Sequence, residues 1–111
     1  ARRRRAVRNA LPLIRSALHG SDATERWANL AAAMTGYLAD RFNLPPGTLT
    51  PDDARTLLES HTVEPQLAHD LVSFLTAADA ARYAPSELDD ASVRQATQDV
   101  RRWIRQLERM R

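Results

Sequence analysis

Hydrophobic residues recur along this chain at intervals of three and four, the spacing of one face of an α-helix. No convincing stretch alternates between apolar and polar positions, as a half-buried strand would. Proline, glycine and capping residues divide the pattern into successive segments. The pattern predicts an all-α fold, a compact bundle of four to five helices.

The first helical segment is set apart by its charge and by a proline. Its apolar stripe consists of Val7, Leu11, Ile14 and Leu18. Pro12 stands inside the stripe, where we expect it to kink or delay the helix, and Gly20 is expected to end the helix. We therefore divide the chain into a basic arm or helix, residues 1–20, and a helical-bundle domain, residues 21–111.

Helix starts in the second part are marked by residues whose side chains accept hydrogen bonds from backbone N–H groups. Asp22, Thr50 and Ser86 are the expected N-caps, and Asp22 and Ser86 each have an acid three residues later. Pro51 suits the first position of a short helix. The expected core positions are Trp27, Leu30, Met34, Tyr37, Leu38, Phe42, Ala54, Leu57, Leu58, Leu67, Leu71, Phe74, Leu75, Ala78, Val93, Thr97, Val100, Ile104 and Leu107.

The composition excludes several kinds of chemistry. The chain has no cysteine and no lysine, since all sixteen basic residues are arginine. Thiolate chemistry, disulfides, Schiff bases and the lysine of a phosphate-binding loop are therefore absent. Its three glycines lie far apart, so no glycine-rich loop is formed. We expect no enzyme, no catalytic residues and no cofactor.

Two clusters of titratable residues have simpler interpretations than a reactive site. His61 and His69 lie near several acids, but their spacing matches no common metal motif, so solvated helix ends are the preferred interpretation and no metal is expected. The pairs Asp52–Asp53 and Asp89–Asp90 are adjacent in sequence, so their side chains point about 100° apart on a helix. Both pairs suit helix N-termini, which favour negative charge.

Charge is distributed unevenly around a net value of +2. Residues 1–20 hold six arginines and no acid, residues 21–91 hold four arginines against twelve acids, and residues 92–111 hold six arginines against two acids. A uniformly basic nucleic-acid-binding protein would lack the acidic middle. Most aromatic residues lie on core stripes, but Trp103 is expected at the edge of its stripe, as a possible contact surface.

A family resemblance covers most of the chain. The segments "YLADRFNLP" at 37–45 and "ARYAP" at 81–85, the short helix capped by Thr50, and a valine followed by an acid at 63–64 carry it. Together they resemble the cytoplasmic C-terminal region of BatD proteins, the bacterial oxygen-tolerance (aerotolerance) family. The resemblance implies a domain at the cytoplasmic face of the bacterial inner membrane, below a single spanning helix. It also implies an adaptor role beside a MoxR-type AAA+ ATPase and von Willebrand factor A-domain proteins.

Two surfaces follow as hypotheses. Arginines directly after a spanning helix obey the positive-inside rule, so Arg2, Arg3, Arg4, Arg5 and Arg8 are expected to face an anionic membrane surface. The alternative is a solvated helix that happens to be basic.

The acidic middle is the second surface. Asp70 and Asp79 are its candidate partner-binding residues, because acids toward helix middles or C-termini are not explained by capping. Trp103, on the basic last helix, is a further candidate partner-binding residue. Solubility is the alternative explanation for those acids. A small basic nucleic-acid-binding domain is the alternative function, although the acidic middle would repel phosphate.

Overall fold

The computed structural model places five α-helices in the expected order and shows no strand among the residues it describes. The described residues are 2–17, 22–44, 49–81 and 89–110. The helices are α1 (Arg2–Ala17), α2 (Ala23–Arg41), α3 (Pro51–Ser60), α4 (Pro65–Ala80) and α5 (Asp90–Glu108). The predicted all-α bundle of four to five helices is confirmed.

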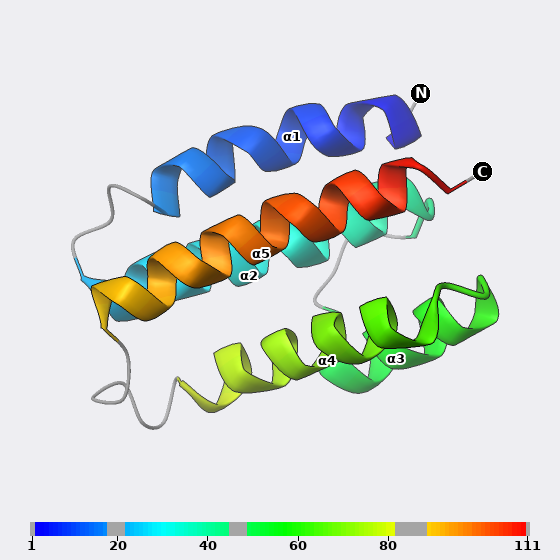
Figure 1. Cartoon of the computed structure of the whole chain (residues 1–111). Coiled ribbons are helices and arrows are strands. Elements are labelled where there is room, and N and C mark those ends of the chain that lie inside the picture. Colours follow the sequence, from blue (N-terminus) through cyan, green and yellow to red (C-terminus); the bar gives the residue numbers. More distant parts are fainter. Residues whose placement is uncertain (1, 18–21, 45–48, 82–88, 111) are drawn as a thin grey trace.

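The helices form two groups that pack on each other (Figure 1). α1 packs mainly on α2, and α5 also lies against α2 and contacts α1. α3 and α4 pack mainly on each other, and α4 joins this pair to α2 and α5. A single apolar core is shared by all five helices, because each contributes buried residues to it.

The helix starts show which capping predictions hold. Asp22 accepts a hydrogen bond from the backbone N–H of Glu25 at 2.7 Å, and Thr50 forms a complete capping box with Asp53. The last helix begins later than predicted, because Asp89 is its N-cap. The expected cap at Ser86 lies outside the described residues, as does the expected helix end at Gly20.

In α1 the predicted apolar stripe is partly wrong. Among the described side chains of α1, Ala6, Ala10 and Ile14 are buried, whereas Val7 is half-buried and Leu11 is 39% exposed. The predicted stripe residue Leu18 lies outside the described residues. The small alanine side chains let α1 approach α2 closely, and this orientation turns the larger Leu11 outward. The helix also includes Pro12, which neither ends it nor delays its start.

The core of the other helices follows the predicted stripes closely. All the expected core positions listed above are buried except Trp27 and Phe42, which are half-buried. Leu71 in α4 is completely buried, and Ile104 in α5 is almost so. These residues fix the positions of α4 and α5 relative to the core, and so position the groove between the two helices.

Candidate functional site

A groove between α4 and α5 brings together two of the three residues predicted to bind a partner. It encloses about 570 Å³, and its lining includes Asp70 and Trp103. Positions 70, 73, 74 and 77 of α4 form one wall, and positions 92, 95, 96, 99, 102 and 103 of α5 form the other. We call this surface the acidic groove.

The base of the acidic groove is aromatic. The ring of Phe74 lies between those of Trp27 and Trp103, with centroid distances of 5.5 and 5.7 Å and tilted ring planes. The prediction that Trp103 lies at an exposed edge is wrong, because only 5% of its surface is exposed. Packing against Phe74 buries the indole and makes it part of the groove's base.

Carboxylates lie on both walls of the acidic groove. Asp70 on α4 accepts a hydrogen bond from the Gln66 amide at 2.9 Å. Asp99 on α5 accepts one from the Gln95 amide at 3.1 Å and pairs with Arg102 at 3.2 Å. Each contact comes from the same helix as the carboxylate it holds, so the two acids are oriented by local partners and remain half-buried at the groove.

Asp79, the third predicted partner-binding residue, lies elsewhere. It lines a different groove of about 450 Å³ between α2, α3 and α4. The structure therefore separates Asp79 from Asp70, although both belong to α4. Sequence reasoning missed Asp99, Phe74 and Trp27 as site residues, because the charge of Asp99 is hidden in a basic helix and the two aromatics fit the core pattern.

His61 and His69 lie in different surroundings. The ring of His61 packs against Phe42 with a centroid distance of 4.4 Å, while His69 lines a third groove, of about 830 Å³, between α3 and α4. Within the described part of the chain, no group of three His, Cys, Asp or Glu residues is arranged to hold a metal ion.

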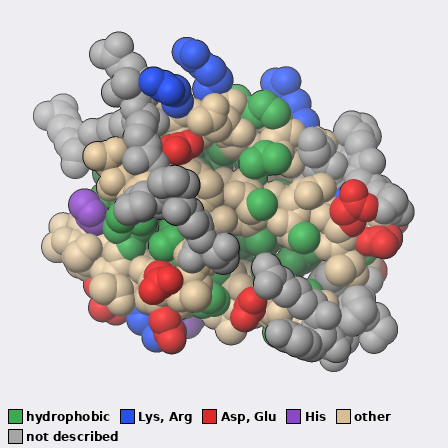
Figure 2. Space-filling view, turned by 180° about the vertical axis from the view of Figure 1, so that it is seen from behind, with side chains coloured by type: hydrophobic (Ala, Val, Ile, Leu, Met, Phe, Trp, Pro, Cys, Tyr) green, Lys and Arg blue, Asp and Glu red, His purple; other side chains and the backbone are tan. Residues whose placement is uncertain are grey.

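The two helices that carry most of the arginines lie side by side. α1 contacts α5 although the two are the first and last helices (Figure 1). Arg5 and Arg8, predicted to face a membrane, are exposed, and so is Arg15. The side chains of Arg2, Arg3 and Arg4 lie outside the described set. Seen from behind, basic side chains gather along the α1 edge, and most carboxylates lie away from it (Figure 2).

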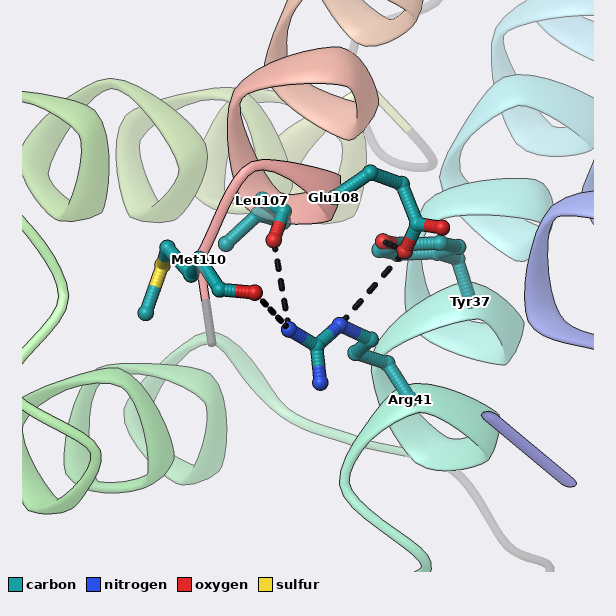
Figure 3. A network of polar contacts seen from close by, with 5 residues as sticks. All are labelled: Tyr37, Arg41, Leu107, Glu108 and Met110. Atoms are coloured by element: carbon teal, nitrogen blue, oxygen red, sulfur yellow. Dashed lines mark hydrogen bonds and ion pairs between the residues drawn. The ribbon is translucent and has the colours of Figure 1, made fainter. Parts of the chain in front are cut away.

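A buried arginine joins α2 to the end of α5 (Figure 3). The guanidinium of Arg41 donates hydrogen bonds to the carbonyl oxygens of Leu107 and Met110, at 3.3 and 3.1 Å. Its Nε also pairs with Glu108 at 3.5 Å. These carbonyls belong to the last turn of α5 and the residues after it, where the helix has few N–H donors of its own to satisfy them. The Leu107 carbonyl also accepts a hydrogen bond from the backbone N–H of Met110 at 3.1 Å. Arg41 therefore acts as a cap supplied by another helix.

Tyr37 completes this arrangement by donating a hydrogen bond to the Glu108 carboxylate. Burial raises the pKa of the Tyr37 phenol well above its usual value, and the hydrogen bond to Glu108 and its negative charge raise that pKa further. The phenol therefore stays protonated in the folded protein at pH values where an unfolded tyrosine ionises.

We expect the protein to lose stability above about pH 10, where tyrosine ionises in the unfolded chain. Because folded Tyr37 keeps its proton, the free energy of unfolding should fall with rising pH by up to about 1.4 kcal/mol per pH unit. Urea denaturation at a series of alkaline pH values measures this slope. Tyr37→Phe should remove most of it, and an equal decline in Tyr37→Phe would assign the effect to another group.

None of the described helices is long and apolar enough to span a bilayer. In comparisons with known proteins, no family model, no curated protein and no solved structure matches this chain.

Proposed function

We propose that this chain is a non-enzymatic interaction domain that docks a basic protein segment in the acidic groove. The main observation behind this proposal is that Asp70 and Asp99 line opposite walls of the groove. Its base is formed by the aromatic side chains of Trp27, Phe74 and Trp103. An arginine or lysine side chain entering it would meet Asp70 on the α4 wall and would compete with Arg102 for the Asp99 carboxylate on the α5 wall. The carboxylates attract a cation, and the half-buried ring of Trp27 adds an aromatic contact.

The resemblance of residues 37–45 and 81–85 extends this proposal to a cellular role. We propose that the domain belongs to a BatD-like single-span protein and lies at the cytoplasmic face of the inner membrane. It would act there as an adaptor in stress tolerance, and the docked segment would belong to a MoxR-type AAA+ ATPase or a von Willebrand factor A-domain protein.

Reversing the charge of Asp70 should weaken docking about tenfold at low salt, because an arginine there repels a basic segment. Asp79→Arg is the matched control, since it makes the same change on the same helix outside the acidic groove. Titration of each variant with the purified ATPase and the A-domain protein measures the effect. Circular dichroism checks that both variants fold.

Three outcomes separate the parts of the proposal. Loss of binding in Asp70→Arg but not in Asp79→Arg supports the acidic groove. Equal binding by both variants and the unchanged protein would remove the groove as the docking site. Failure of the unchanged protein to bind either candidate partner would count against the BatD-like role.

Binding of nucleic acid is a second candidate function, favoured by the contact between α1 and α5. In the sequence the two basic segments are separated by the acidic middle, but the fold brings them together. Exposed arginines occur on both helices: Arg5, Arg8 and Arg15 on α1, and Arg94 and Arg105 on α5. Arg109, just after α5, is exposed too, and Arg102 of α5 lies at the acidic groove. A surface of this kind attracts phosphate whatever carries it, so the test of the next proposal includes duplex DNA.

A further inference from the structure

The outer face of α1 has an unusual composition for a solvated helix. Arg8, Leu11, Pro12 and Arg15 are all exposed. Their spacing of three, four and seven residues places them on one side of the helix. Leu11 and Leu13 are the large hydrophobic residues that the described surface exposes most, at 39% and 40%. We call the four residues at positions 8, 11, 12 and 15 the outer stripe.

The opposite face of α1 is fixed to the bundle. Ala6, Ala10 and Ile14 are buried in the shared core. The amide of Asn9 donates a hydrogen bond to the Asp40 carboxylate of α2 at 3.1 Å. Because these contacts hold the helix, the outer stripe faces away from the protein in a defined orientation.

The charge around the outer stripe has one sign. α1 contains six arginines and no acid. Figure 2 shows that this positive character continues along the α1 edge of the molecule. A partner of the outer stripe must therefore be anionic and must also accept a leucine side chain.

We propose that α1 is an interfacial helix that binds the surface of an anionic phospholipid bilayer through the outer stripe. Arg8 and Arg15 would contact lipid phosphates, and Leu11 between them would enter the boundary of headgroups and acyl chains. Helices with a cationic and apolar surface bind in this way. The proposal goes beyond docking in the acidic groove and does not depend on it.

The exposed leucine distinguishes this proposal from binding to nucleic acid. Phosphate contacts with a duplex come from charged and polar groups, and Leu11 can contribute to none of them. A lipid surface offers both a layer of phosphates and an apolar layer beneath it. The combination of Arg8, Leu11 and Arg15 therefore fits a bilayer better than a polyanion.

The chain itself supplies a matched control for the test. Leu13 is as exposed as Leu11. Two residues along a helix correspond to about 200°, so Leu13 projects on the other side of α1 and off the outer stripe. Leu11→Gln and Leu13→Gln therefore make the same chemical change at equal exposure, and only the first alters the proposed contact.

The experiment is co-sedimentation of the whole chain with vesicles of phosphatidylcholine alone or mixed equally with phosphatidylglycerol. We expect binding to the mixed vesicles only. Leu11→Gln should weaken it about tenfold, and Leu13→Gln should have little effect. Replacing Arg8 and Arg15 together by glutamine should weaken it at least tenfold, and added salt should weaken binding by the unchanged protein.

Several results would overturn the proposal. If Leu11→Gln binds the mixed vesicles as tightly as the unchanged protein, the attraction is one of charge alone and Leu11 does not enter the bilayer. Equal losses in Leu11→Gln and Leu13→Gln would mean that the outer stripe is not the contact. Tight binding to duplex DNA, with weak binding to both vesicle types, would assign the basic surface to nucleic acid. Thermal unfolding of each variant confirms that it remains folded.

Discussion

Leu71→Ala and Ile104→Ala are each expected to lower the free energy of unfolding by about 2–5 kcal/mol. Leu71 is completely buried in α4, and Ile104 is 6% exposed in α5. Shortening either side chain removes apolar contacts and leaves a cavity that the surrounding helices fill only in part. Urea denaturation followed by far-UV circular dichroism measures the change.

Leu13→Ala is the control for these two substitutions. It removes the same atoms as Leu71→Ala from a side chain that is 40% exposed, so we expect a change below about 1 kcal/mol. Similar losses at Leu13 and Leu71 would contradict the assignment of the core. Little change at Leu71 or at Ile104 would show that α4 or α5 turns a different face inward.

Arg41→Met should destabilise the protein by about 2–3 kcal/mol. Methionine preserves much of the apolar stem of Arg41. It cannot donate the hydrogen bonds that the Arg41 guanidinium makes to the carbonyl oxygens of Leu107 and Met110. The Leu107 carbonyl would keep only its backbone donor, the N–H of Met110 at 3.1 Å, and the Met110 carbonyl would lose the guanidinium donor. Denaturation measures the total loss, and hydrogen exchange should show faster opening in the last turn of α5.

Arg55→Met is the matched control for Arg41→Met. Arg55 also pairs with an acid, Asp52 at 3.1 Å, but both side chains are largely exposed. Exposed ion pairs contribute at most about 1 kcal/mol, so the loss should be small. If the two substitutions cost the same, the cap that Arg41 provides to α5 does not contribute to stability.

Local signals in the sequence predicted the helices well. The caps at Asp22 and Thr50 were predictable because an N-cap interaction involves residues three apart in sequence. The last helix shows the limit of that signal. Ser86 and Asp89 are both good capping residues, and only the fold shows that the helix begins after Asp89.

The orientation of α1 was not predictable from hydrophobicity alone. A stripe through Leu11 is more apolar than one through Ala6 and Ala10, yet the alanine side is buried. The choice depends on how closely α1 approaches α2, which is a property of the pair of helices. Because the packing of α1 on α2 decides which side of α1 is exposed, the outer stripe could not be recognised in the sequence.

The candidate site was predicted as separate residues and not as a groove. The sequence marks Asp70 because capping does not explain it, and Trp103 because it adjoins the apolar stripe of its helix. Their proximity depends on α4 packing beside α5, which no local pattern specifies. Asp99 was missed because it is one of two acids in a segment with six arginines. Its position opposite Asp70 is visible only in the folded chain.

The division of the helices into two groups has a consequence for cooperativity. α3 and α4 pack mainly on each other, so this hairpin is a natural unit of partial unfolding, able to separate while α1, α2 and α5 stay together. The acidic groove has one wall on α4, in this hairpin, and the other on α5, in the remaining group of helices. It exists only when the two groups are packed together. A docked partner would therefore stabilise the packing of the α3–α4 hairpin against the other three helices by its binding free energy. Any event that loosens the hairpin would in turn release the partner.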